Sequence, residues 1–330
     1  MSNAGEIRPF RLPPAAFCFV LAAAVQAGAA APEFPNRPIR VVVPFTPGGQ
    51  PDIVSRLMAP KLSEIFQQQV VVDNRPGAGG AIGGRIVATA APDGYTVLSV
   101  SAAHSIQPYT RANMGYHPLK DFAGITLTAN AAYYLVVPAT LEVRTVKELI
   151  ALAKAKPGQL NFASAGAGSA THFGGELFKF TAGIDMVHIP QRGIPEALTD
   201  TVAGRSHFFM APFGSSIGLI KEGRLRALAV STVKRSRVTP DIPTIAESGL
   251  PGFRYDSWNA WYAPVRTPRT IIDQLNREAG RVLMLPEIGE RLLAIGIEPA
   301  HSTPEELDKF TAQQVAEAGE LARKAGIKPE

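Results

Sequence analysis

The sequence has almost no cysteine, which removes several kinds of chemistry. Its only cysteine, Cys18, lies in an apolar stretch near the first residue. The rest of the chain therefore has no thiol that could form a disulfide, bind a metal or act as a nucleophile. The six histidines are scattered, and no two of them follow the H-x-x-x-H or H-E-x-x-H spacing of a zinc site. These absences exclude cysteine chemistry and argue against a bound metal.

Long runs of one residue type are also missing. Beyond the N-terminal stretch, no segment has the roughly 18 consecutive apolar residues that a membrane-spanning helix needs. The net charge of +5 is spread thinly, without a run of Lys and Arg and without the interleaved aromatic residues of nucleic-acid grooves. With 46% hydrophobic and 18% charged residues, we expect a globular protein that has no nucleic-acid partner.

The N-terminal stretch has the pattern of an export signal. Arg8 and Arg11 precede the apolar run Ala15–Val25, and the small residues around Ala27-Gly28-Ala29 resemble a cleavage site. We predict that residues 1–31 are removed during export. Removing two arginines and one glutamate with this segment would lower the net charge from +5 to +4.

In the rest of the chain, short apolar runs alternate with helical patterns, which is the βαβ signature of an α/β protein. Thr145 with Glu148, and Thr303 with Glu306, mark two helix starts by the spacing of a capping box. The expected strands are Ile39–Phe45, Gln69–Asp73, Tyr95–Val100, Tyr133–Val137, Leu160–Ala163, Met186–Ile189, His207–Met210, Ala227–Ser231 and Trp258–Val265. The expected helices are Asp52–Phe66, Ala81–Ala90, Val146–Ala155, Ser169–Thr181, Pro195–Val202, Ile217–Glu222, Arg269–Leu285 and Pro304–Ala325.

The turn Pro47-Gly48-Gly49 follows the first expected strand and is the first candidate binding loop. It is not a phosphate-binding P-loop, because Gln50, Pro51 and Asp52 stand where that motif needs Lys and Ser or Thr. Exposed backbone amides at a helix start can instead stabilise a single carboxylate without a side-chain charge. We expect Asp52 to support the loop, since it would repel an anion if it pointed at the ligand.

Two further loops place small residues between a strand and a helix. The segment Ser164–His172 offers backbone amides and hydroxyl groups, and either Ser169 or Thr171 should cap the helix that follows. The segment Pro190–Gly193 adds an amide side chain and Arg192, which is either a ligand contact or a solvated charge. Several helix starts that converge on one cleft are the arrangement expected of an anion-binding site.

Two other kinds of site match the glycine-rich segments less well. The segment Gly77–Gly83 follows a strand and enters a helix, yet Ile82 stands where the dinucleotide motif G-x-G-x-x-G needs its third glycine. Ser169 and His172 are one helix turn apart and could form the Ser–His pair of a secreted hydrolase, although a histidine on a helix is commonly structural. We therefore expect no cofactor and no metal, and the hydrolase stays an alternative.

Several motifs along the chain together resemble a known family. They are Pro44–Asp52, Asn74–Gly80, Pro92–Tyr95, Ser164–His172 and Pro240–Gly252, followed by Trp258. Each motif alone is weak, but the series is specific because it runs in order from about Phe34 to the C-terminus. In this series the chain resembles the periplasmic solute receptors of tripartite tricarboxylate transporters, also called Bordetella uptake gene (Bug) receptors.

The resemblance implies a type II periplasmic-binding-protein-like fold, in which two α/β lobes are joined by two crossover strands and the ligand lies in the cleft between them. On this sequence, lobe 1 would cover residues 36–136 and 257–330, and lobe 2 residues 137–256. The resemblance also implies that the loops Phe45–Gly49 and Ser164–Ser169 hold a carboxylate. The predicted ligand-binding residues are Phe45, Thr46, Pro47, Gly48, Gly49, Asp52, Ser164, Ala165, Gly166, Gly168, Ser169, Thr171, His172, Gln191, Arg192, Gly193 and Ala211.

The implied function is that of a non-enzymatic monomeric receptor, which binds a small organic carboxylate or dicarboxylate and docks transiently on the membrane subunits of its transporter. Relatives often have Tyr at the position of Gln191 and acids near His207 and Ala211, where this sequence has none. These departures disfavour an amino-acid ligand, whereas Gln191 and Arg192 could receive a second carboxylate, a carbonyl or an amide. The alternatives are a ligand sensor without a transporter and the secreted serine hydrolase.

Overall fold

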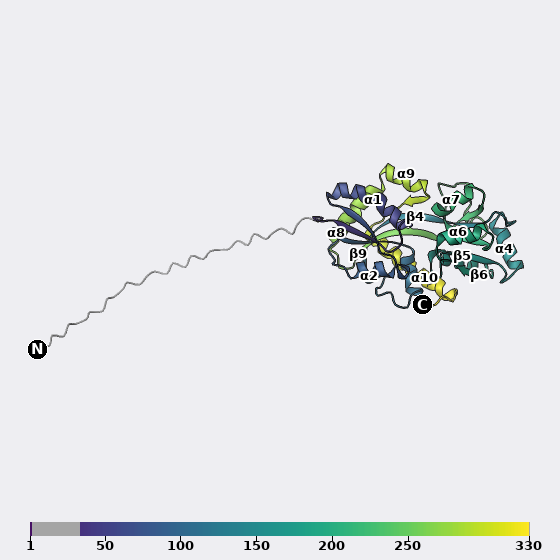
Figure 1. Ribbon diagram of the computed structural model, residues 1–330, viewed down its shortest axis with the longest axis horizontal. Coiled ribbons are helices and arrows are strands. Elements are labelled where there is room, and N and C mark those ends of the chain that lie inside the picture. Colours follow the sequence, from purple (N-terminus) through teal and green to yellow (C-terminus); the bar gives the residue numbers. More distant parts are fainter. Residues whose placement is uncertain (2–33, 330) are drawn as a thin grey trace. The chain divides into compact units, whose positions relative to one another are not determined.

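The computed structural model describes Met1 and residues 34–329, so the predicted export signal lies outside the described residues. Strands and helices alternate along residues 34–329, as the sequence predicts (Figure 1). The strands are β1 (Ile39–Val43), β2 (Val70–Asn74), β3 (Thr96–Ser101), β4 (Phe122–Pro138), β5 (Asn161–Ser164), β6 (Val187–Pro190), β7 (Phe208–Pro212), β8 (Leu225–Val230), β9 (Asp256–Pro264) and β10 (Ile297–Pro299).

The helices between these strands vary from one turn to 21 residues. They are α1 (Gln50–Phe66), α2 (Ala81–Ala88), α3 (Ala103–Ile106), α4 (Val146–Ala155), α5 (Ala170–Ala182), α6 (Ile194–Val202), α7 (Phe213–Lys221), α8 (Arg269–Leu283), α9 (Pro286–Ala294) and α10 (Pro304–Lys324), with the 3-10 turns η1 (Ala78–Gly80) and η2 (Gln107–Tyr109). None of the helices in residues 34–329 combines the length and the apolar character that a membrane crossing requires.

The strands pair in the order β2-β1-β3-β9-β4-β7-β5-β6, and β8 and β10 pair with β4 outside this path. Two groups of parallel strands lie at its ends. In one group β1 pairs with β2 and β3, and in the other β5 pairs with β6 and β7. Because ligands bind at the carboxyl ends of parallel strands, the loops after β1 and β5 lie at the two edges where a site is expected.

The 17-residue strand β4 joins the two lobes. Residues 122–132 of β4 pair with β9, whereas residues 133–138 pair with β7 and β8. Because β9 also pairs with β3, it belongs to the sheet of the first lobe. Figure 1 shows β4 between the group of β9, α1 and α8 and the group of β5, β6 and α6. The exact residues at which the lobes are divided stay a prediction.

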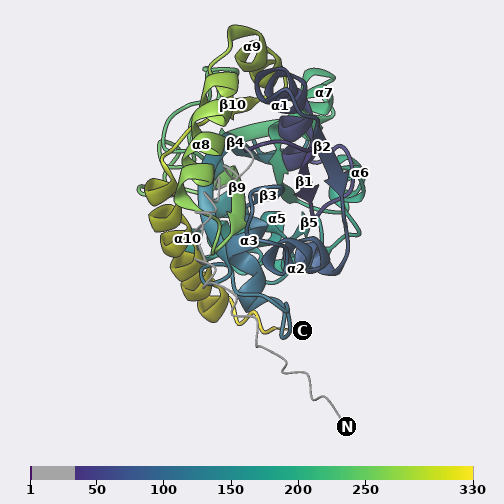
Figure 2. The ribbon, with the colours of Figure 1, turned by 90° about the vertical axis from the view of Figure 1, so that its left-hand side faces the viewer.

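The side chains of β9 show how the sheet of the first lobe is packed on both faces. Trp261 belongs to the apolar cluster that includes residues of α1, α8 and α9. Trp258 and Tyr262 point to the opposite face and pack with residues of α2 and α10. This alternation is the period of two expected of a strand. Figure 2 shows α1, α8 and α9 on one side of the sheet and α2, α3 and α10 on the other.

Three predicted elements need correction. The helix expected over Ile217–Glu222 is α7, which begins at Phe213 and ends at Lys221. The helix expected over Arg269–Leu285 ends at Leu283, and a separate helix, α9, begins at Pro286. Leu285, which precedes this proline, has an extended backbone with φ −65° and ψ 129°, because proline disfavours the helical conformation of the residue before it. The strand expected over Tyr133–Val137 is only the last part of β4, which begins at Phe122.

Candidate ligand-binding site

The first loop, Phe45–Gly49, joins β1 to α1 and is held in place by Asp52, which is 3% exposed. Asp52 Oδ2 accepts the backbone N–H of Gly48 at 2.9 Å, and Oδ1 accepts from Arg56 Nε at 2.9 Å and from Asn74 Nδ2 at 3.0 Å. Gly48 has a φ of +85°, which favours glycine. The carboxylate therefore supports the loop from inside, as expected, and the amide of Gly48 is already used.

Other amides of this segment remain available to an anion. Gly49 is the N-cap of the 17-residue helix α1, and no side chain caps this helix start. Among the described residues, the backbone N–H groups of Thr46, Gly49 and Gln50 have no hydrogen-bond partner. Thr46 is exposed, and Gly49 and Gln50 are half-buried. Unpaired N–H groups at the positive end of a helix dipole form an anion site.

The second loop, Ser164–Ser169, follows β5 and is closed by hydrogen bonds of its own. The N–H of Ala165 donates to Thr171 Oγ1 at 2.8 Å, and the N–H of Gly168 donates to His172 Nδ1 at 3.1 Å. These two amides are therefore used inside the loop. They fix its shape and are not available as donors to a ligand.

Free donors of this region include amides in the first turn of α5. Ser169 is the N-cap, and its Oγ accepts the N–H of His172 at 3.2 Å, which confirms one of the two caps expected. The N–H groups of Ala170 and Thr171 have no partner among the described residues. Ala170 is absent from the predicted site because the amides that stay unpaired are set by the hydrogen bonds inside the loop, which the sequence does not show.

Two stacked histidines lie beneath the second loop. The ring centroids of His172 and His188 are 3.8 Å apart with an interplanar angle of 15°, and Ser164 Oγ is 2.7 Å from His188 Nε2. Burial lowers the pKa of His172 to about 4 and that of His188 to about 3, so both rings are neutral at neutral pH and stack without charge repulsion. Because His172 Nδ1 accepts from the Gly168 amide, it does not receive the Ser169 hydroxyl that a hydrolase would need.

The third loop, Gln191–Gly193, follows β6 and lies against the second. The N–H of Gln191 donates to the carbonyl of Ser164 at 3.0 Å. The side-chain amide of Gln191 donates to Asp200 of α6, so it is held within the second lobe. Arg192 is exposed and forms no ion pair with any residue in 34–329, whereas nearby Arg205 pairs with Asp200. Of the two side chains predicted for the far end of the ligand, Arg192 alone is unengaged within the described residues.

A short chain of close approaches connects the first and second loops. A Cβ atom on Gly80 would lie 3.4 Å from Phe45 Cε1 and 2.8 Å from Gln107 Nε2. A Cβ atom on Gly168 would lie 2.8 Å from Cβ of Thr110, which directly follows the 3-10 turn that starts at Gln107. The first loop and the second loop are therefore connected through the segment Gln107–Thr110.

The chain matches a known protein family over most of its length. Residues 54–327 match the family described as "Tripartite tricarboxylate transporter family receptor". The chain belongs to this receptor family. The resemblance that the sequence motifs indicate is thereby confirmed.

Three solved structures are similar to the receptor over most of its length. "R. palustris Rpa4515 with adipate" has a TM-score of 0.81 and 34% identity, and covers 90% of this chain and 100% of that chain. The "periplasmic binding protein BugD" has a TM-score of 0.78 and 33% identity over 90% and 100% of the two chains. "MatC (Rpa3494) from Rhodopseudomonas palustris with bound malate" has a TM-score of 0.75 and 28% identity over 88% and 100%. The predicted fold is confirmed by these likenesses.

Two further residues of the predicted site, Ala211 and Gly193, have different surroundings from each other. Ala211 lies on β7 opposite Tyr134, is fully buried and belongs to the core cluster that includes Phe213. Its side chain is therefore part of the core of the second lobe. Gly193 is the N-cap of α6 with an extended backbone. It adds a helix start beside Arg192, without a side chain.

A serine motif of hydrolases is present in the receptor but does not form a nucleophile. Gly214–Gly218 has the G-x-S-x-G spacing, with Ser216 at its centre, and follows β7 directly. In a hydrolase this serine is exposed on a strained turn. Here Ser216 lies inside α7, is fully buried, and donates to the carbonyl of Pro212 at 3.0 Å. The spacing is therefore satisfied by an ordinary helix, which argues against the hydrolase alternative.

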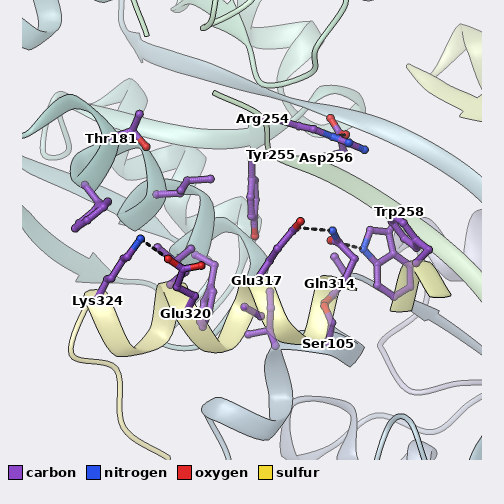
Figure 3. Close-up of a pocket in the computed structure, with 18 of the residues that line it drawn as sticks. Ser105, Thr181, Arg254, Tyr255, Asp256, Trp258, Gln314, Glu317, Glu320 and Lys324 are labelled. Carbon is purple, nitrogen blue, oxygen red and sulfur yellow. Dashed lines mark hydrogen bonds and ion pairs between the residues drawn. The ribbon is translucent and has the colours of Figure 1, made fainter. Parts of the chain in front are cut away.

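A cavity of about 430 Å³ lies between α10, α5 and the segment 252–258 (Figure 3). None of the predicted site residues lines it. Its two cations are engaged, because Arg254 pairs with Asp256 at 2.6 Å and Lys324 with Glu320 at 2.5 Å. Glu317 adds a further negative charge. The cavity is therefore a poor match for a carboxylate ligand.

Proposed function

We propose that this receptor binds a small organic carboxylate between its lobes and delivers it to the membrane subunits of a tripartite transporter, without catalysing a reaction on it. One observation carries the proposal. Two helix starts, those of α1 and α5, offer unpaired amides, and the loops before them are connected through the segment Gln107–Thr110. A ligand bound there would hold the lobes together, as solute receptors require.

The hydrogen-bond energy of such a site can be compared with the binding free energy of a micromolar complex. Hydrogen bonds to a charged group contribute about 1.5–3 kcal/mol each. The unpaired amides of Gly49, Gln50, Ala170 and Thr171 would therefore supply a gross interaction of the order of the −8 kcal/mol of a micromolar complex, before the cost of association is subtracted. No cationic side chain is needed to hold the first carboxylate.

The related structures support this ligand class and the location. Adipate and malate, present in the structures of two relatives, are both small dicarboxylates. BugD is described as a periplasmic binding protein. With the export signal expected over residues 1–31, these relatives favour a periplasmic receptor. We infer the transporter subunits from the family alone.

A thermal-shift screen tests the proposal directly. We expect at least one of adipate, malate, succinate and hexanoate to raise the midpoint of unfolding. A ligand at 100 times its Kd adds about 2.7 kcal/mol of stability. The matched diamides, which have the same shape without the charge, should have no effect. Equal stabilisation by an acid and its diamide, or by none of the acids, would contradict a carboxylate site.

Arg192 is expected to favour a second carboxylate. Its guanidinium is exposed and unpaired within the described residues, and it can bind a planar anion through two parallel hydrogen bonds. Arg192→Ala should therefore lower the affinity for adipate by about tenfold, and that for hexanoate by less than threefold, in calorimetry. Arg205→Ala, which removes an arginine already paired with Asp200, is the control. Equal losses for both acids would make Arg192 an ordinary surface charge.

A further inference from the structure

Two buried amide side chains at the cleft edge of the first lobe have polar atoms without a partner. Asn259 on β9 is completely buried, and neither its Nδ2 nor its Oδ1 has a hydrogen-bond partner. Gln50, the first residue of α1, has an unpartnered buried Nε2, while its Oε1 accepts from Ser257 Oγ at 3.1 Å. Nearly all buried polar groups in proteins are paired, so three orphan atoms in two neighbouring side chains require an explanation.

The strand register places these atoms beneath the first turn of α1. Ser257, Asn259 and Trp261 share one face of β9, because side chains alternate along a strand. Ser257 bonds to Gln50 and Trp261 Nε1 donates to Ser55 Oγ at 3.3 Å, so both neighbours of Asn259 on this face contact α1. Asn259 therefore lies under the helix start that offers the unpaired amides of Gly49 and Gln50.

The same register places Asn259 at the cleft edge of the sheet. Asn259 pairs with Ser101, the last residue of β3. The carboxyl ends of β1 and β3 lie at one edge because the two strands are parallel. The first loop leaves β1 at this edge. Asn259, Gln50 and Ser257 thus form a polar floor, directly below the predicted carboxylate site.

The chemistry of the floor selects one kind of ligand group. The orphan atoms are two N–H donors, Gln50 Nε2 and Asn259 Nδ2, and one acceptor, Asn259 Oδ1. Exchanging the N and O of Asn259 leaves this inventory unchanged. A hydroxyl group can accept from both donors and donate to the acceptor. A carboxylate would leave Oδ1 facing a negative oxygen, and an ammonium could not accept from either donor.

We propose that the floor formed by Gln50, Ser257 and Asn259 binds a hydroxyl group of the ligand, so that the receptor selects a hydroxylated carboxylic acid over its deoxy analogue. This proposal rests on the carboxylate function argued above and adds the ligand's second recognised group. A site built to bond a hydroxyl rejects the analogue that lacks it, because its own buried groups are then left unpaired.

The test uses two pairs of acids that differ by one hydroxyl, malate with succinate and lactate with propionate. Calorimetry on the intact protein should show the hydroxy acid binding at least tenfold more tightly in one pair or both. Asn259→Leu, which keeps the shape and removes the amide, should reduce that ratio to less than threefold. Because Asn259 is buried and its variant could fail to fold, Gln50→Met at the half-buried helix start is the second variant and should narrow the same ratio.

The control variant is Gln69→Met, an exposed glutamine of the same chemistry outside the cleft, which should keep the wild-type ratio. Equal binding of hydroxy and deoxy acids by the wild type would overturn the hydroxyl site and leave the carboxylate function intact. An equal loss for both acids in Asn259→Leu and Gln50→Met would overturn it as well, and would mean that the floor holds internal water only. If no carboxylate stabilises the wild type, the proposed function itself fails.

Discussion

Gly48→Val is expected to remove most of the affinity for carboxylates while the protein stays folded. Gly48 has a φ of +85°, and no other atom lies within 4 Å of the position of its missing Cβ, so the obstacle is backbone strain rather than a clash. A β-branched residue in this conformation costs about 1–3 kcal/mol. The loop should relieve the strain by changing its backbone, which would turn the amides of Gly49 and Gln50 away from the ligand.

Gly223→Val is the control that distinguishes the effect of backbone strain on stability from an effect on ligand binding. Gly223 follows α7, has a φ of +68°, and likewise has no atom within 4 Å of its Cβ position, but it lies in none of the three loops. Both variants should lower the urea midpoint by similar amounts. Only Gly48→Val should lower the affinity for the best ligand of the screen, by tenfold or more. Unchanged affinity in Gly48→Val would mean that the carboxylate does not bind to the first loop.

The sequence predicts the elements whose signals are local. The Thr145 hydroxyl accepts the N–H of Glu148 at 3.2 Å, and α4 has the predicted bounds Val146–Ala155. Thr303 and Glu306 form the complete capping box of α10. The glycine-rich loops could also be predicted, because their pattern lies within a short stretch of sequence. It consists of a strand, then small residues, then a helix start.

Features that depend on distant residues could not be predicted. The first part of β4 lacks a clear apolar alternation and is a strand because it pairs with β9, more than a hundred residues later. The roles of individual loop residues depend in the same way on their partners. The second loop uses the predicted Ala165 and Gly168 amides internally, whereas the amide of Ala170 has no partner among the described residues.

The polar floor is the clearest example of a feature that neighbouring residues in the sequence do not reveal. Ser257 and Asn259 read as ordinary positions of a strand, and Gln50 as part of a helix start. Only the pairing of β9 with β3, together with the crossing of α1 above them, brings the three side chains together at the cleft edge. The candidate residues for hydroxyl selectivity are therefore visible only in the structure, whereas the candidate anion loops and Arg192 could be predicted from the sequence.

Asp52→Asn is expected to weaken both the fold and the binding of carboxylates. The buried carboxylate accepts from Gly48, Arg56 and Asn74, whereas an amide of the same shape must point its NH₂ group at one of these donors. Losing one partner of such a group costs about 1–3 kcal/mol. We expect the free energy of unfolding to fall by about 2–3 kcal/mol in urea titrations, and ligand affinity to fall at least fivefold in calorimetry.

Two opposite effects act on affinity in this variant, and the geometry decides between them. Removing a negative charge near an anion site would by itself strengthen binding. The charge of Asp52, however, is already offset by Arg56, and its Oδ2 holds the N–H of Gly48 in the first loop. Release of this loop should therefore dominate. Asp73→Asn removes a carboxylate that also pairs with arginines but lies on β2, so it should cost stability without changing affinity. Tighter binding by Asp52→Asn would show instead that Asp52 acts on the ligand through its charge.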